Sequence, residues 1–291
     1  MTGLILKGIG SFYTLLGKDG AQWVCKACGR FRKDGVVPMP GDTAKFDVDG
    51  DGKGYITDIL QRKNSLVRPM VANVDKLLIV FSASAPEPDF ILIDKLLLQC
   101  ELLNVIPLLI QNKQDELAMD AKDEMEQYQR AGYICIHASA ATHQGIDELK
   151  MHIAGNVCCF AGQSAVGKSS LLNAMLPELG LPVGGLSKKT EHGKHTTRHA
   201  ELWPAYGGWV LDTPGFSLLD MTELQPHELS ASYPEMRELR CACRFPECMH
   251  ISEPDCAVKL ALQNGEISQD RYDRYLLLVN ELKEMRKHKY D

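Results

Sequence analysis

The sequence predicts an α/β protein in which a small β-barrel precedes a doubly wound parallel sheet and a mainly helical segment follows it. Three observations predict this fold class. Short β-type runs separated by glycine and aspartate turns fill roughly the first 67 residues. Continuous apolar runs alternating with helical periodicity come next, and after about residue 221 the periodicity is mainly helical around a Cys/His cluster. We therefore expect units at residues 1–67, 68–221 and 222–291.

The composition excludes several classes of protein. The 291 residues are 45% hydrophobic and 24% charged, as in ordinary soluble domains. The sequence contains no apolar run of about 18 residues, so it predicts no membrane span. The start lacks a basic region and a cleavage site, so the ten cysteines are expected to be reduced thiols or metal ligands in a cytoplasmic protein. The net charge of −6 gives no global nucleic-acid signal, so any RNA contact requires a local basic patch.

The first unit has the pattern of a small barrel such as an OB-fold. Its β-type segments are residues 12–16, 22–25, 43–48 and 54–60. Basic residues gather in the same unit, and they form either a solvated face or a contact with RNA phosphates. These residues are Lys26, Arg30, Arg32, Lys33, Arg62, Lys63 and Arg68.

The second unit alternates buried strands with helices, which predicts a doubly wound sheet. The expected strands are residues 77–81, 105–110, 133–137, 157–161 and 208–211. The expected helices are residues 90–103 and 168–176, with an acid-rich helix before the strand at 133–137. In the third unit, a long last helix is expected over residues 269–286.

A phosphate-binding loop is predicted between the strand at 157–161 and the helix that begins at Lys168. The run G-Q-S-A-V-G-K-S matches G-x-x-x-x-G-K-[ST], whose glycines turn backbone N–H groups toward phosphates. Lys168 would reach the β- and γ-phosphates, and Ser169 would ligate Mg²⁺. In the D-T-P-G run that ends a later strand, Asp212 would hold Mg²⁺ through water and Gly215 would contact the γ-phosphate. The expected phosphate-site residues are Gly162, Gln163, Ser164, Ala165, Val166, Gly167, Lys168, Ser169, Ser170, Asp212 and Gly215.

A second pair of motifs predicts that the base is guanine. Asp115, in N-K-Q-D after a buried strand, can accept two N–H bonds from guanine, whereas adenine lacks both donors. Asn112 would brace the loop, and the stem of Lys113 would cover the base. Ser139 and Ala140 resemble the motif whose backbone amide meets the guanine oxygen. The motifs together therefore predict a GTP-binding protein.

The order of these motifs is unusual. In ordinary GTPases the phosphate motifs come before the base motifs, whereas here N-K-Q-D and Ser-Ala come first. The chain is therefore predicted to hold a circularly permuted P-loop G domain, because compact domains tolerate rewired termini. The segment after Gly215 leads directly into the third unit, so the nucleotide state is expected to move that unit.

The basic segment at residues 187–199 suits a switch that orders around Mg²⁺ and the γ-phosphate, the alternative being a plain surface loop. Thr197, or failing that Thr196, would ligate the Mg²⁺. Phe216 stands where Ras-like GTPases place a glutamine that orients water. Either hydrolysis is slow alone or another group acts, and His195 is the candidate for aligning the water. The expected catalytic residues are His195, Thr197 and Lys168.

A structural zinc site is predicted in the third unit. Cys243, Cys248, His250 and Cys256 form the spacing C-x4-C-x-H-x5-C, and three thiols with one imidazole suit a closed tetrahedral Zn²⁺ site. Scattered core cysteines are the alternative, and Cys241 is a weaker candidate ligand.

These motifs resemble those of the RsgA (YjeQ) family of bacterial circularly permuted GTPases. The resemblance runs over nearly the whole chain and includes N-K-Q-D, G-Q-S-A-V-G-K-S-S, G-K-H-T-T-R-H, D-T-P-G-F and the Cys/His spacing. It implies an OB-fold, a permuted G domain and a zinc domain. It also implies a cytoplasmic factor, expected to be a monomer, that acts in late maturation of the 30S subunit. Such a factor binds 16S rRNA, and the subunit stimulates its GTP hydrolysis.

Two other functions compete with this reading. The first is a nucleotide-dependent kinase of a small metabolite, which the N-K-Q-D motif and the lack of an arginine-rich acceptor lid disfavour. The second is an RNA-binding scaffold with an inactive nucleotide site, against which the complete set of motifs speaks.

Overall fold

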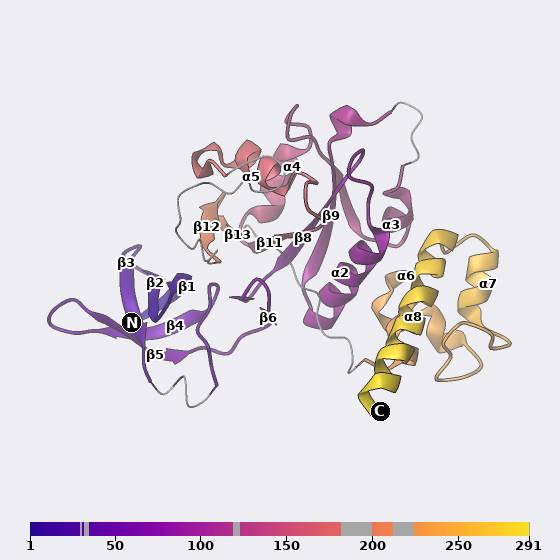
Figure 1. Cartoon of the computed structure of the whole chain (residues 1–291), viewed down its shortest axis with the longest axis horizontal. Coiled ribbons are helices and arrows are strands. Elements are labelled where there is room, and N and C mark those ends of the chain that lie inside the picture. The colour runs from indigo at the N-terminus through magenta and orange to yellow at the C-terminus, as the bar shows by residue number, and fades with distance from the viewer. Residues whose placement is uncertain (30, 32–34, 119–122, 182–199, 212–223, 291) are drawn as a thin grey trace.

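The computed structural model describes the chain except residues 30, 32–34, 119–122, 182–199, 212–223 and 291. Three bodies follow one another along the long axis (Figure 1). A barrel holds the N-terminus, an α/β sheet lies in the middle, and a helical body holds the C-terminus. This order of barrel, α/β sheet and helical body is that of the predicted fold class.

The N-terminal barrel is closed, with its strands in the order β1-β2-β3-β5-β4. β3 pairs in parallel with β5 and the other adjacent pairs are antiparallel, which is consistent with the predicted OB-fold. Buried side chains from every strand fill the interior, among them Ile5, Leu15, Cys25, Phe46 and Ile56. The strands are β1 (Thr2–Ile9), β2 (Phe12–Gly17), β3 (Gln22–Ala27), β4 (Thr43–Val48) and β5 (Gly54–Ile59).

The central sheet has the strand order β10-β9-β8-β11-β13-β12. It is parallel except for β12, which pairs antiparallel with β13 at one edge. A short hairpin of β6 (Ser65–Leu66) and β7 (Val71–Ala72) connects it to the barrel. The sheet strands are β8 (Lys76–Ser82), β9 (Ile106–Asn112), β10 (Ile134–His137), β11 (Val157–Ala161), β12 (Leu202–Ala205) and β13 (Gly208–Leu211).

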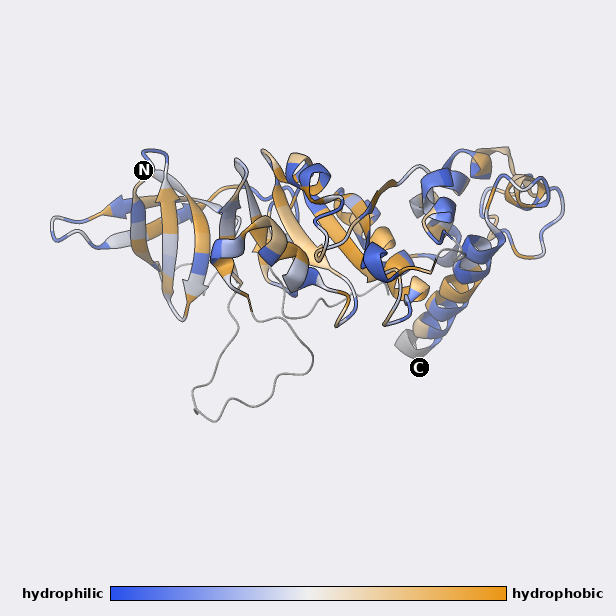
Figure 2. Ribbon diagram, turned by 90° about the horizontal axis from the view of Figure 1, so that it is seen from above, coloured by the Kyte–Doolittle hydropathy of each residue, from blue (hydrophilic) through white to orange (hydrophobic). Residues whose placement is uncertain are grey.

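Helices cover both faces of this sheet, because its central strands are apolar on both sides. In β8, Leu77 and Ile79 face the cluster formed with α2 and α3, whereas Leu78 and Val80 face the cluster formed with α4 and α5. Figure 2 shows hydrophobic residues concentrated on the strands of the barrel and the sheet. The helical elements here are α2 (Phe90–Leu103), η1 (Gln114–Glu116), α3 (Glu126–Arg130), α4 (Ile146–Ile153), α5 (Lys168–Met175) and η2 (Pro177–Leu179).

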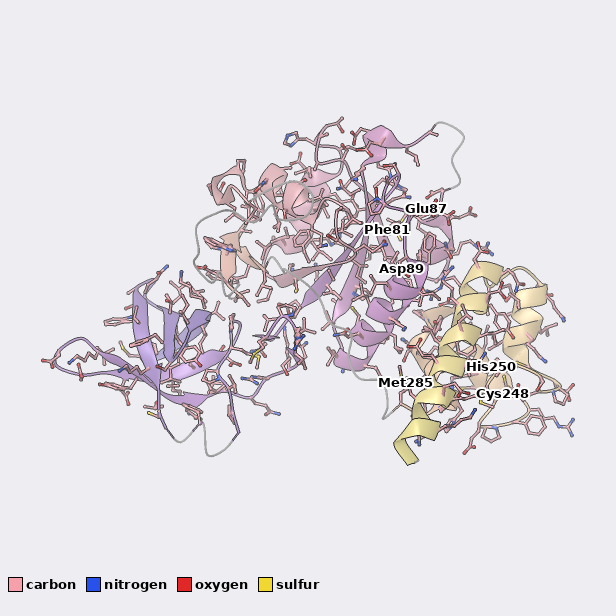
Figure 3. All side chains as sticks on the ribbon, viewed as in Figure 1. Phe81, Glu87, Asp89, Cys248, His250 and Met285 are labelled. Carbon is pink, nitrogen blue, oxygen red and sulfur yellow. The ribbon has the colours of Figure 1, made fainter. Side chains whose placement is uncertain are left out.

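The C-terminal body packs its own apolar core against α2. Leu98 of α2 lies in the same buried cluster as Tyr233, Tyr275 and Leu278. Figure 3 places Cys248 and His250 in this body, beside the long last helix α8, on which Met285 lies. Among the described residues, every helix is too short or too polar to cross a bilayer. The elements of the body are η3 (Pro226–Ser232), α6 (Pro234–Arg237), η4 (Leu239–Ala242), α7 (Ala257–Gln263) and α8 (Gln269–Tyr290).

Candidate nucleotide site and metal centre

The predicted nucleotide motifs follow strands whose carboxyl ends meet at one edge of the sheet. Asn112 ends β9, Ser139 follows β10 and Gly162 follows β11. β9 and β11 both pair with β8 in parallel, so their ends point the same way. Ligands bind in open α/β sheets at this edge. Gly162 lies 50 positions after Asn112 in the chain. The motifs therefore converge at this edge although they are far apart in the sequence.

Two glycines of the phosphate loop are required by its backbone. Gly162 has a φ of 125°, and a Cβ there would lie 2.0 Å from the carbonyl oxygen of Val80. Gly167 has a φ of 91°, and its Cβ would lie 2.3 Å from Nδ2 of Asn112. Residues that carry a Cβ rarely adopt such φ values. The loop can therefore follow this tight path only with glycine at both positions.

The phosphate loop leads directly into helix α5, which begins at Lys168. The first amides of a helix lack partners within it and attract anions. Nζ of Lys168 folds back over the loop and donates to the carbonyl oxygens of Gly162 at 2.9 Å and Gln163 at 2.5 Å. Its cation therefore lies above the loop, where phosphate oxygens would meet it.

Ala165, within the same loop, has a φ of 65°, which is strained for a residue with a Cβ.

The buried side chain of Asn112 joins three motifs. Its Nδ2 donates to the carbonyl oxygen of Val166 at 2.8 Å, which ties the base motif to the phosphate loop. Its Oδ1 accepts the backbone N–H of Ala140 at 3.2 Å. Asn112 is 2% exposed, and a buried amide is stable only when its donors and acceptors are paired. The two halves of the predicted site therefore lie side by side, despite their inverted order in the chain.

A pocket of about 550 Å³ opens beside this joint, within the size range of small-ligand sites. Ser139 donates to Oδ1 of Asp115 at 2.5 Å and accepts the N–H of Thr142 at 3.1 Å, so the carboxylate is held in one orientation. The pocket brings together the N-K-Q-D loop, the Ser-Ala loop and the start of α5. Its lining is Asn112, Lys113, Asp115, Glu116, Ala140, Ala141, His143, Gly167, Ser170, Asn173, Ala174 and Pro177.

Several of these lining residues were not predicted from the sequence. Glu116, His143 and Asn173 belong to no motif, and only their place next to one of the motifs in the chain would have indicated them. Backbone conformation sets the position of His143, whose φ is 61°. Such a conformation has no reliable sequence signature outside glycine.

Some predicted residues cannot be placed. Asp212, Gly215, His195 and Thr197 lie outside the described residues, as does Phe216. Their proposed roles in Mg²⁺ binding and water alignment therefore stay predictions. Ser169 and Ser170 are described, in the first turn of α5.

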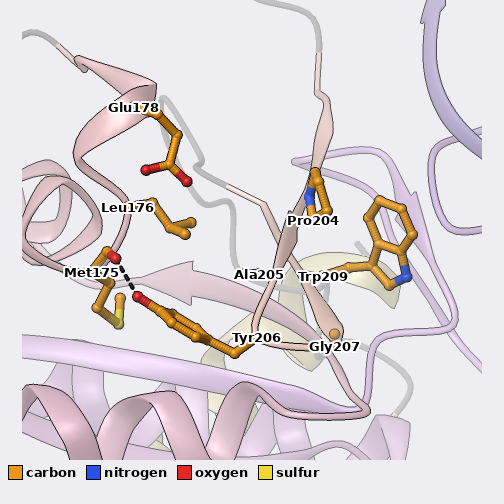
Figure 4. A pocket seen from close by; sticks show the side chains of 9 residues that line it. Met175, Leu176, Glu178, Pro204, Ala205, Tyr206, Gly207 and Trp209 are labelled. Carbon is orange, nitrogen blue, oxygen red and sulfur yellow. Dashed lines mark hydrogen bonds between the residues drawn. The ribbon is translucent and has the colours of Figure 1, made fainter.

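A second pocket, of about 500 Å³, lies between the β12–β13 turn and the end of α5 (Figure 4). The hydroxyl of Tyr206 donates to the carbonyl oxygen of Met175, and this bond closes one side of the pocket. Glu178 and Trp209 line it as well. The pocket contains none of the predicted nucleotide residues.

The predicted metal ligands converge in the C-terminal body. The ligand atoms of Cys243, Cys248, His250 and Cys256 all lie within 4.8 Å of one another. Sγ of Cys243 is 3.9 Å from Sγ of Cys256, and Nδ1 of His250 is 3.6 Å and 3.3 Å from these two sulfurs. Tetrahedral Zn²⁺ bonds would give about 3.8 Å between sulfurs and about 3.5 Å between sulfur and nitrogen. The cluster can therefore hold a metal ion, and Cys241 is exposed and outside it.

Burial sets the protonation states of the cluster. Burial raises the pKa of the Cys248 thiol to about 12 and lowers the pKa of the His250 imidazole. The imidazole is therefore neutral, as a ligand must be, and an incoming cation has to displace the thiol protons. Tyr272 donates to the carbonyl oxygen of His250 at 2.5 Å, and Glu253 accepts the N–H of Met249 at 2.9 Å. These bonds hold the ligand loop in shape.

The parallel sheet and the order of motifs along its carboxyl edge define the fold of a circularly permuted P-loop GTPase. Comparison with known families agrees. The family model described as RsgA GTPase matches residues 59–222, and the model of the RsgA N-terminal domain matches residues 2–56. The chain belongs to the RsgA GTPase family.

Relatives and solved structures match over nearly the full length. A protein of Geobacillus thermodenitrificans named small ribosomal subunit biogenesis GTPase RsgA is 44% identical over 99% of both chains. Its namesake from Ruminiclostridium cellulolyticum is 44% identical over 99% of this chain and 95% of its own. The crystal structure of YjeQ from Thermotoga maritima is 34% identical with a TM-score of 0.82, over 97% of this chain and 98% of that one. The structure of YloQ, described as a circularly permuted GTPase, is 34% identical with a TM-score of 0.80, over 97% and 95%.

Proposed function

We propose that this chain is a GTP-hydrolysing factor that acts in late maturation of the 30S ribosomal subunit, and that the subunit stimulates its hydrolysis. One structural observation carries the nucleotide part: Asn112 bonds to both the phosphate loop and the Ser-Ala loop, which assembles a single pocket from dispersed motifs. The ribosomal part rests on full-length similarity to proteins named for small-subunit biogenesis.

In this proposal, the chain's own residues select and hold the nucleotide. Asp115 accepts the two guanine N–H groups, and its bond from Ser139 keeps the carboxylate aimed at the pocket. Lys168 leaves its carbonyl partners for the β- and γ-phosphates, which the loop amides surround. Ser169 and Thr197 would hold Mg²⁺, which when bound neutralises charge on the phosphates. His195 aligns the attacking water, because Phe216 carries no group able to do so.

The metal cluster is proposed to hold one structural Zn²⁺. Three thiols and one imidazole leave no open position, and the separations between their ligand atoms fit tetrahedral bonds. Such an ion would stabilise a body whose described helices other than α8 are all short.

The barrel is proposed to contact 16S rRNA through a face on β2, β3 and β5. Lys26 lies across from Phe12 and from Tyr55 in the strand register, and its Nζ is 4.9 Å from the centre of the Phe12 ring. Phe12 and Tyr55 are 49% and 39% exposed. Exposed aromatic rings beside a cation suit stacking on bases and pairing with phosphate. This combination is typical of nucleic-acid faces on OB-folds.

Two of the basic residues first considered for RNA have other partners. Arg62 binds the fully buried Asp42 through Nε at 2.7 Å and Nη2 at 2.8 Å, so its charge serves the fold. Lys63 pairs with Asp75. Arg30, Arg32 and Lys33 lie outside the described residues. Of the described basic residues, Lys26 and the exposed Arg68 remain, and Lys26 alone lies beside the exposed rings of Phe12 and Tyr55 in the strand register. We therefore assign the RNA contact mainly to Lys26, in a protein that works in the cytoplasm as a monomer.

The deciding experiment compares the GTPase rate with and without purified 30S subunits. Stimulation supports the proposal, and an unchanged rate contradicts the ribosomal part alone. A titration with fluorescent guanine and adenine nucleotides tests the base preference. Preferred binding of ATP would favour the metabolite kinase, and complete lack of GTP turnover would favour the scaffold.

A further inference from the structure

A side chain of the phosphate loop makes a contact that phosphate binding does not require. Oε1 of Gln163 accepts the backbone N–H of Asp89 at 2.9 Å, and its Nε2 donates to the carbonyl oxygen of Glu87 at 3.2 Å. Figure 3 places Glu87 and Asp89 at one end of α2. The side-chain amide of Gln163 therefore fixes the phosphate loop against a segment that contains Asp89, 74 positions earlier in the chain.

The segment that Gln163 grips is the start of α2. Asp89 is the N-cap, and its Oδ1 accepts the N–H of Leu92 at 2.9 Å. A cap of this kind sets where the helix begins and in which direction it leaves. Ile93, Leu96 and the following apolar residues bury α2 on the sheet, so the helix moves only as a unit.

The C-terminal body holds the same helix through buried charges. Asp94 of α2 accepts from Nη1 of Arg271 and from Nε of Arg274, both at 2.6 Å and both from α8. Arg271 also binds Glu235 at 2.8 Å. Asp94 is fully buried and the side chain of Arg271 is 1% exposed. Desolvated pairs are stable only in a well-fitted geometry, so this contact locks α8 to α2 in one relative position.

We propose that Gln163 is a positioning residue for the nucleotide site, and that it links the phosphate loop, through α2 and Asp94, to the docking of the C-terminal body. The inference rests on the proposed role of residues 162–169 in phosphate binding. Docking of α8 sets the position of α2. The hydrogen bonds of the Gln163 amide to the start of α2 then set the position of the phosphate loop, and the backbone N–H groups of the loop are thereby placed to bind the phosphates. By thermodynamic reciprocity, a bound nucleotide must tighten the docking of α8.

The first test is Gln163→Met, which keeps the length of the side chain and removes both hydrogen bonds. Two neutral hydrogen bonds correspond to about a 5- to 150-fold loss of affinity, so fluorescent GDP should bind at least about fivefold more weakly. The effect should appear in the KM for GTP more than in kcat, because the contact holds the loop before and during the reaction. Unchanged GDP affinity would overturn the inference.

The second test is a double-mutant cycle with Arg274→Met, far from the pocket on α8. In the wild-type background this change should also weaken GDP binding, and in the Gln163→Met background it should have no further effect. Arg244→Met is the matched control, because Arg244 pairs with Asp255 at 3.0 Å within the C-terminal body and should not alter GDP affinity. Fully additive effects of the two test variants would overturn the link.

A third readout does not depend on activity. GDP should slow amide hydrogen exchange in α8 of the wild type, and this protection should disappear in Gln163→Met. If Gln163→Met does not fold, GDP affinity and α8 exchange in Arg274→Met still decide the question. A wild type that binds no guanine nucleotide refutes the proposed function itself. A wild type that binds GDP without protecting α8 refutes only the link described here.

Discussion

The buried carboxylate of Asp94 offers a direct measure of what holds the C-terminal body to the G domain. Asp94→Asn keeps the shape of the side chain but removes its charge. The bonds from Arg271 and Arg274 at 2.6 Å then lose their ionic character, and the new amide turns a donor toward one of the guanidinium groups. Burial alone would lower the pKa of Arg271, but Asp94 and Glu235 outweigh it and keep the pKa above its usual value. Without Asp94 the cation loses its main partner, yet arginine keeps its proton in proteins, so the buried charge stays.

The expected cost follows from these contacts. Charge-assisted hydrogen bonds contribute about 1.5–3 kcal/mol each, and breaking a buried ion pair costs about 3–5 kcal/mol. Because Arg271 keeps Glu235 as a partner at 2.8 Å, we expect a loss near the lower end, about 3 kcal/mol. A domain is commonly stable by only about 5–15 kcal/mol, so the change is large. In urea it corresponds to a midpoint shift of about 1–3 M.

Two optical probes weight the bodies differently. The three tryptophans are Trp23, Trp203 and Trp209, all outside the C-terminal body, whereas the helical circular dichroism signal includes α8 together with the helices on the sheet. We expect the helical transition of Asp94→Asn to move to lower urea by more than the tryptophan transition does. Asp147→Asn is the control, because that side chain is 94% exposed. If both variants shift the helical transition equally, the buried network does not hold the bodies together.

Four further predictions test the site. Asp115→Asn replaces an acceptor by a donor, so GDP should bind at least about 100-fold more weakly and xanthine nucleotides relatively better, as titration would show; unchanged GDP affinity contradicts its role. Chelation, or Cys256→Ser, should release one zinc per chain, measured by metal analysis, and melt the C-terminal helices, whereas a metal-free protein with full helicity refutes the zinc site. Ala165→Gly relieves about 1–2 kcal/mol of backbone strain in the folded state, but the greater freedom of glycine in the unfolded chain offsets about 0.4–1 kcal/mol of this gain. The free energy of unfolding should therefore rise by about 0.5–1 kcal/mol, and a lower Tm would contradict the strain at this position. His195→Ala should bind GTP normally but lose about 100-fold or more of subunit-stimulated hydrolysis, and unchanged turnover removes it from the mechanism.

The elements that the sequence predicted well carry strong local patterns. Strands β4, β11 and β13 and helix α2 have the predicted bounds, because continuous apolar runs and helical spacing define them. Strand β1 was not predicted, because a register irregularity between Ile5 and Lys7 breaks its alternation, and Ile5 is buried in the barrel while Leu6 is buried against the central sheet. Strand β12 was missed because it is short, lies at an edge and contains Pro204.

The residues of the site and of the domain contact also differ in how well the sequence predicts them. The ligand spacing of Cys243 and its partners, and the runs around Lys168 and Asp115, are chemical requirements that lie within short stretches of chain, so the sequence shows them. The contact between Asp94 and Arg271 joins positions 177 apart. The fold selects such pairs, and nothing in the local sequence distinguishes these charged residues from others on a solvated face.

The strand order has a consequence for how the protein is made. Strand β8 lies between β9, which follows it closely in the chain, and β11, which begins only at Val157. During synthesis, the barrel and the β8-β9-β10 part leave the ribosome first, and one long side of the very apolar β8 has no backbone partner until β11 emerges. Unpaired apolar strand edges invite wrong association, so the growing chain passes through a vulnerable stage in mid-synthesis. An unpermuted relative, which makes its phosphate loop first, would meet that stage at a different point of its translation.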